Sequence, residues 1–130
     1  MPGSSVSVEN ETNTTITTTD EVVVATLTGV SQSSAGRRIR FSGSAKITTA
    51  ANTTALNLRI RRDSLTGTEI SESNPETIEA ATGSTEDRGI EADDAPAGEI
   101  FNATYVLTIQ ATAATANGTC VYAYLRADSE

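Results

Sequence analysis

Apolar and polar residues alternate strictly over residues 38–48. One face carries Ile39, Phe41, Gly43, Ala45 and Ile47, and the other carries Arg38, Arg40, Ser42, Ser44, Lys46 and Thr48. A period of two residues is typical of a β-strand with one buried face. Residues 56–61 repeat this alternation after a short turn-forming segment. The two segments are therefore predicted to form a hairpin in which Ile47 pairs with Leu56, because this register makes their apolar faces coincide.

Other apolar segments are short and separated by turn residues. Residues 21–28 and 100–112 have the composition of strands, and Asn117-Gly118 favours a tight turn before a last strand at residues 119–126. Alternation in this last strand places Val121, Ala123 and Leu125 on one face and Cys120, Tyr122 and Tyr124 on the other. Cys120 lies in an apolar run and is expected to be a small core residue.

No segment has a sustained helical period. About eight to ten short strands at intervals of about 8–12 residues predict an all-β fold, an antiparallel β-sandwich with the jelly roll as first choice. Residues 1–10 are polar, apart from the alternating Val6 and Val8, and are expected to form an extended N-terminal arm. Residues 11–130 are then one β-sandwich domain, with no linker dividing it.

Composition indicates a thin core. Only 4% of the 130 residues are aromatic and none is Trp, so Val, Ile, Leu and Ala must supply most of the buried area. A thin core favours an oligomer, in which subunits bury further surface against one another. The formal net charge of -8 disfavours nucleic acid and anionic membranes as partners.

The charges are unevenly distributed along the chain. Seven of the nine basic residues lie between residues 37 and 62, whereas residues 69–99 carry ten acids. Several like charges on one hairpin need compensation. The acidic segment of the same chain, a neighbouring subunit, an acidic partner protein and, less readily, nucleic acid are the alternatives that the sequence leaves open.

The sequence offers little catalytic chemistry. It has no His, one Cys and no glycine-rich phosphate loop, which removes the usual bases, zinc ligands and nucleophiles. Acidic pairs among Glu91, Asp93 and Asp94 suit a glycosidase, but aromatic sugar platforms are scarce. The same acids with Asp87 are a candidate cation site, although a solvated acidic face is the preferred interpretation. The expectation is a protein without enzymatic activity or cofactor.

The order of these elements resembles a known class of viral proteins. A strand at residues 21–30, a basic segment ending in Leu58-Arg59-Ile60-Arg61-Arg62, the run at 105–110 and the Asn117-Gly118-Thr119 closing strand are similar to small β-sandwich structural proteins of tailed phages and archaeal tailed viruses, including capsid decoration (cement) proteins. The resemblance covers residues 20–127 loosely. It implies a homotrimer that clamps adjacent major capsid protein subunits, often through an N-terminal arm.

Composition also suggests the kind of organism from which the protein comes. A single Lys, many acids and abundant Thr and Ala resemble a salt-adapted protein, which suggests a virus of a halophilic archaeon. Residues 1–5 lack the features of a signal peptide, so synthesis in the host cytoplasm is expected. The resemblance to decoration proteins implies a place on the capsid exterior of the virion. The candidate interface residues are Pro2, Gly3, Ser4, Ser5, Val6, Arg38, Arg40, Arg59 and Arg61.

Two other functions remain open at this point. One is a turret, head-fibre or tail accessory protein that binds a host surface through loops such as residues 31–36 and 63–76. The other is a cellular module that binds carbohydrate or calcium.

Overall fold

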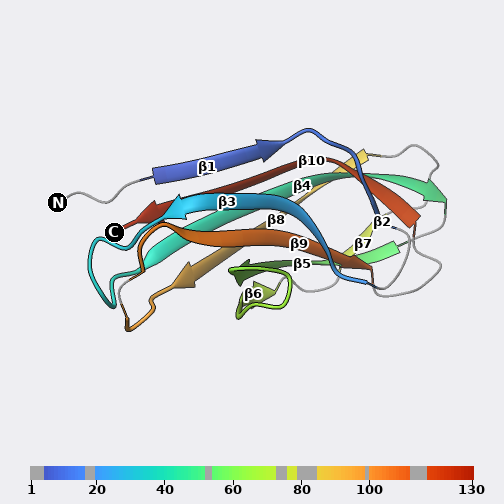
Figure 1. Cartoon of the computed structure of the whole chain (residues 1–130). Helices are drawn as coiled ribbons and strands as arrows, with labels where there is room; N and C mark the ends of the chain where they lie inside the picture. Colours follow the sequence, from blue (N-terminus) through green and yellow to red (C-terminus); the bar gives the residue numbers. More distant parts are fainter. Residues whose placement is uncertain are drawn as a thin grey trace.

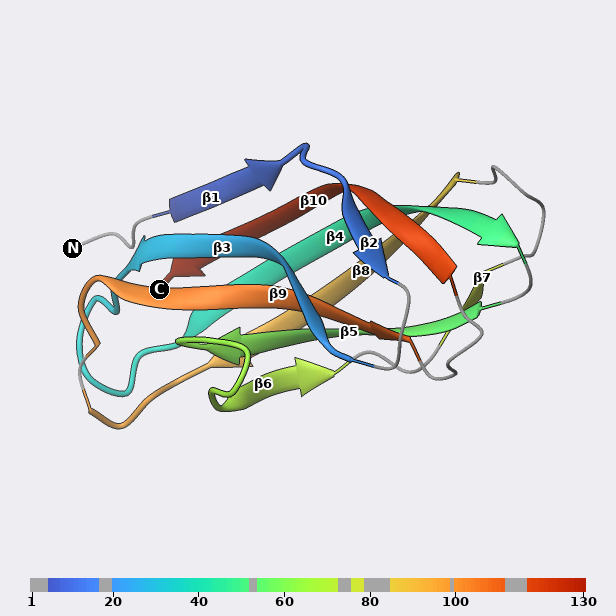
Figure 2. The ribbon, with the colours of Figure 1, turned by 45° about the vertical axis from the view of Figure 1, so that its right-hand side comes forward.

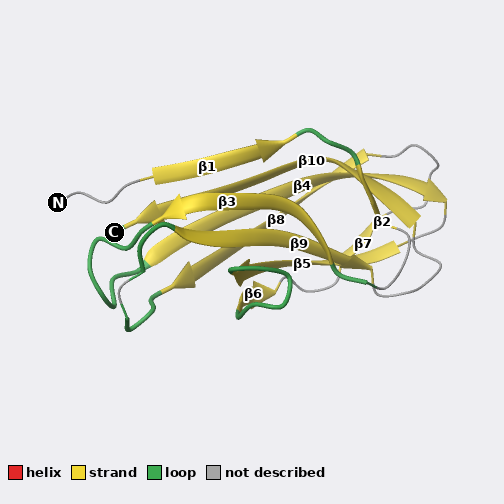
Figure 3. Cartoon of the chain, viewed as in Figure 1, coloured by secondary structure: helices red, strands yellow, loops and turns green. Residues whose placement is uncertain are grey.

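The computed structural model describes residues 5–16, 20–51, 54–72, 76–78, 85–98, 100–111 and 117–130, and all the regular elements within them are strands (Figures 1 and 3). They are β1 (Ser5–Asn10), β2 (Thr14–Ile16), β3 (Val22–Val30), β4 (Ile39–Ala51), β5 (Thr54–Arg62), β6 (Glu69–Glu72), β7 (Glu76–Ile78), β8 (Thr85–Asp94), β9 (Ala103–Ala111) and β10 (Asn117–Ser129). None of these ranges contains a helix that could span a membrane.

The strands form two antiparallel sheets that pack face to face (Figure 2). The first sheet has the order β1-β10-β4-β8, with β2 also paired to β10. The second has the order β3-β9-β5-β6, with β7 also paired to β5. Pairing is nested: the first strands pair with the last, β3 with β9, β4 with β8, and β5 with its immediate successors. This nested order is that of a jelly roll, so the predicted fold class is confirmed.

The core lies between the two sheets and consists mainly of aliphatic side chains. The first sheet contributes side chains such as Phe41, Ile47 and Leu125, and the second contributes Ile60 and Leu107, all at most 2% exposed. Phe41 also packs against Tyr105 across the core, with ring centroids 4.4 Å apart. The alternation seen in the sequence thus identified the inward-facing residues of β4 and β5 correctly.

The predicted hairpin of these two strands is wrong. β4 pairs with β10 and β8, whereas β5 pairs with β9, β6 and β7, so the two strands lie in opposite sheets. Ile47 is opposite Cys120 and Glu86, and Leu56 is opposite Ala111 and Glu76. Both apolar faces point into the same core from opposite sides. Alternation reports which face is buried, but it does not report which strand is the neighbour.

A bulge in β10 corrects a second prediction. Cys120 is opposite Ile47 and Tyr122 is opposite Lys46, which leaves Val121 as the extra residue. The bulge reverses the alternation, so Cys120 points into the core together with Ala123 and Leu125. Cys120 is 2% exposed, as expected for a core residue, but it does not share a face with Tyr122. Its burial raises the pKa of the thiol.

Candidate functional site: the charged surfaces of the sandwich

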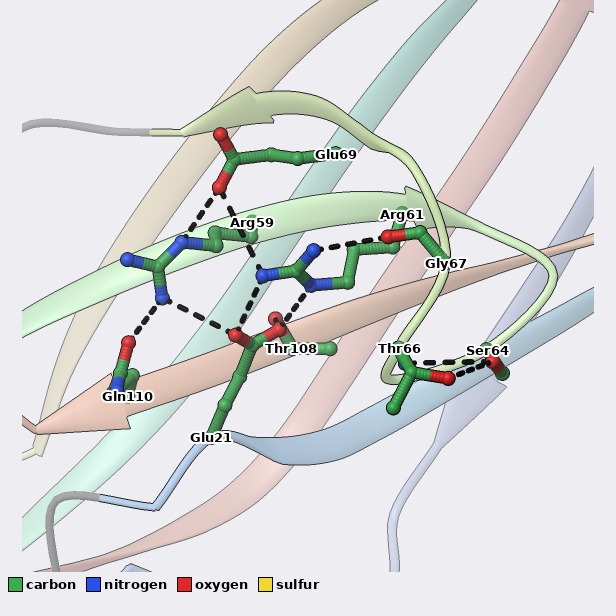
Figure 4. A network of polar contacts seen from close by, with 9 residues as sticks. All are labelled: Glu21, Arg59, Arg61, Ser64, Thr66, Gly67, Glu69, Thr108 and Gln110. Atoms are coloured by element: carbon green, nitrogen blue, oxygen red, sulfur yellow. Dashed lines mark hydrogen bonds and ion pairs between the residues drawn. The ribbon is translucent and has the colours of Figure 1, made fainter.

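The outer face of the second sheet carries a network of ion pairs (Figure 4). The Glu21 carboxylate, just before β3, accepts hydrogen bonds from Arg61 Nε at 2.6 Å and Arg61 Nη2 at 2.9 Å. The hydroxyl of Thr108, on β9, donates to the same carboxylate at 2.7 Å. Thr108 is fully buried, and the side chains of Glu21 and Arg61 are only 13% and 19% exposed. The network therefore joins three adjacent segments of the sheet in a partly desolvated setting.

Arg59 extends this network towards the sheet edge. Its Nε lies 2.8 Å from Glu69 Oε1 on β6, and its Nη1 donates to Glu21 Oε1 at 3.4 Å and to the side chain of Gln110. The remaining donor of Arg61, Nη1, bonds to the carbonyl oxygen of Gly67 at 3.0 Å. Two arginines and two glutamates therefore neutralise each other on this face.

Two effects act on the pKa of Glu21 in opposite directions. Burial of the carboxylate raises its pKa, because the charged form loses water. Hydrogen bonds from Arg61 and Thr108, with the positive charges of Arg61 and Arg59, outweigh burial and hold the pKa below its ordinary value. Glu21 is therefore ionised at neutral pH, as a bidentate arginine partner requires.

A second ion pair joins the two sheets at one end of the sandwich. Arg62, at the end of β5, contacts both oxygens of Asp94 at the end of β8, with distances from 2.7 to 3.1 Å. The buried hydroxyl of Tyr105 on β9 donates to Asp94 Oδ2 at 2.6 Å. Burial, and then the hydrogen bond to Asp94, raise the pKa of Tyr105 above its ordinary value. Asp94 thus stabilises the contact between sheets.

Arg38, just before β4, and Arg40, on β4, lie on a different surface from the basic residues of β5. Arg38 bonds through Nε to Glu130 Oε1 at 3.0 Å and lies 3.7 Å from Asp93 Oδ2. Arg40 Nε lies 3.6 Å from the same Glu130 oxygen. The predicted single basic hairpin face is therefore wrong, because the two strands lie in opposite sheets. Each arginine named here has an acidic partner within its own chain, which was one of the alternatives left open.

The candidate interface residues consequently fall into separate groups. Arg59 and Arg61 lie in the network of the second sheet, whereas Arg38 and Arg40 lie near the C-terminal end of the chain. Pro2, Gly3 and Ser4 lie outside the described residues. Ser5 and Val6 belong to β1, which pairs with β10 along its length. The hydroxyl of Ser5 donates to Asp128 at 2.6 Å, and Val6 packs partly against the core.

The acidic segment of β8 contains no clustered metal ligands. Asp94 points to Arg62 and Tyr105, whereas Asp87, Glu91 and Asp93 are exposed. Within the described ranges, no three acidic or Cys side chains are grouped closely enough to hold a metal ion. A shallow depression of about 370 Å³ over this surface is lined mainly by charged and hydroxyl side chains, among them Arg40, Glu91 and Asp128.

Sequence reasoning did not select Gln32 and Phe101, which lie in the loops at this end. Gln32 joins the loops through hydrogen bonds, and Phe101 is exposed. The side chain of Gln32, 6% exposed, donates from Nε2 to the carbonyl oxygens of Arg37 and Pro96. Its Oε1 accepts from the backbone of Ile100 at 2.8 Å. The next residue, Phe101, is 78% exposed. A glutamine in a polar loop and a phenylalanine beside a strand give no pattern from which these roles could be predicted.

These features define a jelly-roll sandwich with paired charges on its surfaces. No family model and no curated protein matches the chain. Among solved structures, it is similar to the VP2 subviral particle of infectious bursal disease virus (TM-score 0.68, 9% identity, 98% of this chain and 33% of that chain). It is also similar to the T13 particle of that virus (TM-score 0.62, 8% identity, 99% and 36%).

A bacterial protein has a weaker likeness. Latent PorU from Porphyromonas gingivalis matches with a TM-score of 0.51 and 8% identity, over 100% of this chain and 13% of that chain. This chain spans about a third of the length of the two viral chains. At such low identities, the similarity establishes the jelly-roll sandwich fold and carries no site from one protein to another.

Proposed function

We propose that the chain is a virion structural protein, a homotrimeric capsid decoration protein that stabilises a shell of major capsid protein. The observation that carries the proposal is the nested jelly-roll order, an architecture common in viral capsids. The likeness to chains taken from virus particles points in the same direction. The salt-adapted composition favours a tailed virus of a halophilic archaeon as the source.

Its action is mechanical. A protein that binds the assembled shell, and not free capsid subunits, shifts the equilibrium towards the shell by mass action. No substrate is turned over, and no cofactor is needed. The proposed place of the protein is the capsid exterior, with neighbouring copies and the major capsid protein as partners.

The N-terminal residues are the proposed capsid contact. β1 lies at the edge of the first sheet, and β10 is its hydrogen-bonded neighbour among the described strands. An edge strand with free backbone groups can add a strand from another protein. Pro2, Gly3 and Ser4 precede this edge, with Ser5 and Val6 at its start. Arg38 and Arg40 have an acidic partner in Glu130, but their side chains are 41% and 60% exposed, so acidic groups of a partner can reach them.

Arg59 and Arg61 have a less direct role in this proposal. Both guanidinium groups are already bound by Glu21, Glu69 and neighbouring oxygens. A partner can contact this flat, neutralised face, but breaking its ion pairs has a cost. In this proposal, Arg59 and Arg61 maintain the structure of the face that a partner would contact. Arg38 and Arg40 instead form the contacts with charged groups of the partner.

The test is to locate the protein on virions of the tailed virus whose genome encodes it. Gold-labelled antibody against the protein is expected over the whole capsid surface. Shells stripped of the protein should break at a lower temperature than intact shells, and adding the protein back should restore the original temperature. Label confined to turrets, fibres or the tail would replace this proposal with the host-binding alternative. Absence from virions would overturn both, and a melting temperature raised by calcium or sugar would then favour the cellular module.

The arm is tested with a variant lacking residues 2–4. This deletion leaves β1 intact, whereas removing residues 1–10 also removes a strand that pairs with β10. The variant is expected to keep its melting temperature and lose most of its affinity for stripped shells. Binding equal to that of the wild type would show that these residues are not the capsid contact.

A further inference from the structure

Phe101 is a bulky apolar side chain held out into solvent. It is 78% exposed, whereas Phe41 is 2% exposed. It lies in the loop between β8 and β9, at the end of the sandwich where the β3–β4 loop and the C-terminus also lie (Figure 2). Single exposed apolar residues are common on protein surfaces, but aromatic residues are enriched among the anchors of protein interfaces.

The backbone on both sides of Phe101 is fixed. Ile100 exchanges hydrogen bonds with Gln32, through its carbonyl oxygen at 3.2 Å and its amide at 2.8 Å. On the other side, Asn102 has a left-handed φ of 55° and donates its amide to Ser31 Oγ at 3.0 Å. An anchor held in place before binding loses little conformational entropy when a partner covers it.

The same glutamine brings a positive charge to this loop. Gln32 Nε2 donates to the carbonyl oxygen of Arg37 at 3.0 Å within the β3–β4 loop. The same Nε2 donates to the carbonyl oxygen of Pro96 at 2.9 Å, so the β3–β4 loop lies beside the β8–β9 loop. The side chain of Arg37 is exposed and has no ion pair with any residue that the structure describes. This end therefore presents an aromatic side chain and an exposed arginine that forms no ion pair within the described ranges, although its charge helps to lower the pKa of Glu130.

The second surface of this inference is a groove at the edge of the sandwich, where β6 of one sheet lies near β8 of the other. Between β6 and β8 is a groove of about 320 Å³ lined by Ile70, Glu91, Ala92 and Asp93. Ile70 and Ala92 pack against the core and give the groove an apolar part. Glu91 and Asp93 are exposed and make its rim acidic. Asp93 lies 3.7 Å from Arg38 of the same chain, whereas the Glu91 side chain forms no hydrogen bond or ion pair with the described residues, so its charge is available to a partner.

We propose that Phe101 of one copy inserts into the β6–β8 groove of a second copy, with Arg37 facing Glu91. The Phe101 loop carries an apolar ring beside the positive charge of Arg37, and the groove has a small apolar part beside the negative charge of Glu91, so the two surfaces are complementary in charge. We further propose that each interface contains one such contact, which makes it heterologous, so that successive copies form a ring if the rotation closes. This inference rests on the homo-oligomer in the proposed function and assigns the residues of its contact.

The first experiment measures self-association of the full chain by sedimentation velocity and light scattering across a concentration series. Phe101→Ser is expected to weaken association by ~30-fold or more, as for an interface hot spot. Leu65→Ser is the matched control, because Leu65 is also an exposed apolar residue, 39% exposed, on a loop at this end. It should associate as the wild type does. A wild type that stays monomeric, or a Phe101→Ser variant that associates normally, overturns the inference.

A charge exchange tests the pairing itself. Arg37→Glu and Glu91→Arg are each expected to weaken association, and the double variant should recover most of the loss. Because Arg37 and Glu91 are exposed, the melting temperatures of these variants should stay close to that of the wild type. If the double variant associates no more tightly than the single variants, the assigned pairing of Arg37 with Glu91 is wrong.

Shell binding separates this inference from the proposed function. A monomeric wild type that coats stripped shells would end the inference and leave the decoration role intact. If the wild type is monomeric and Phe101→Ser no longer binds shells, the partner of Phe101 is the capsid, and the self-association inference is overturned. Self-association through Phe101 without any place in the virion would keep the inference and end the proposed function.

Discussion

Glu21 and Arg61 form a two-point ion pair on the outer face of the second sheet, with N–O distances of 2.6 and 2.9 Å. The pair reaches across β9, because β9 lies between β3 and β5 in the sheet. Thr108 of β9 donates to the same carboxylate. This contact therefore stabilises the order of three segments that are far apart in the sequence.

Replacement of Glu21 by Gln should be strongly destabilising for a surface substitution. It removes the charge that Arg59 and Arg61 share in a partly desolvated site, and an amide cannot accept both bonds as a carboxylate does. We expect a loss of about 2–3 kcal/mol in the free energy of unfolding at neutral pH, measured in urea. Glu91→Gln is the control and should change stability by less than about 0.5 kcal/mol. Equal effects from the two would contradict this role for Glu21.

The stability contributed by Glu21 should disappear in acid. Its pKa in the folded protein is below the ordinary value of 4.5, so the contribution is fully present above pH 4.5 and is lost as the pH falls through the folded pKa. The difference in stability between the wild type and Glu21→Gln should therefore shrink below pH 4.5. Asp128 and Glu130, whose pKa values are also lowered, are present in both proteins and cancel in this difference. A difference that stays constant in acid would contradict the assignment.

The sequence allowed the fold class and the buried faces to be predicted, because both depend on local alternation. The inward positions of β4 and β5 follow directly from the pattern of Ile39 to Ile47 and of Leu56 to Ile60. The partners of these strands do not. In a jelly roll, consecutive long strands alternate between sheets, so β4 pairs with β8 and β10. Such long-range pairing leaves no signal in the alternation of either strand.

The charged sites show the same limit. Clustering of basic residues in the sequence suggested one surface, but Arg40 and Arg61 lie on separate sheets. Arg61 finds its partner in Glu21, 40 positions earlier in the chain. Phe101 was not selected, because the sequence placed it in a strand over residues 100–112, whereas β9 begins at Ala103. Only the left-handed turn at Asn102 and the hydrogen bonds of Gln32 leave it exposed.

Tyr105→Phe should show how much the buried hydroxyl contributes to the contact between sheets. The ring can still pack on Phe41, but Asp94 loses a 2.6 Å hydrogen bond inside the protein while keeping Arg62. We expect a loss of about 1.5–3 kcal/mol in unfolding free energy, because the lost bond is to a charged group. Tyr124→Phe, on the half-exposed outer face, should cost less than about 1 kcal/mol. If both variants are equally stable, Tyr105 contributes through packing of its ring alone.

Gly43 tests how closely the two sheets approach. It lies on the inward face of β4, and a Cβ atom added there would be 3.1 Å from Ile90 Cγ2 and 3.3 Å from Leu107 Cδ1. Both neighbours belong to the core, so Gly43→Ala should force them to move and lower stability by about 1–3 kcal/mol. Gly98→Ala is the control, because a Cβ atom there meets nothing within 4 Å.

The control should be neutral or slightly stabilising, since alanine restricts the unfolded chain more than glycine does. Thermal and urea unfolding of the two variants, compared with the wild type, measure the difference. If Gly43→Ala and Gly98→Ala have the same melting temperature, the core has space for a methyl group at position 43, and glycine is not required there for the sheets to pack. A large loss confined to Gly43→Ala would mean that the small residues of β4 set the distance between the sheets, which a core with few aromatic side chains requires.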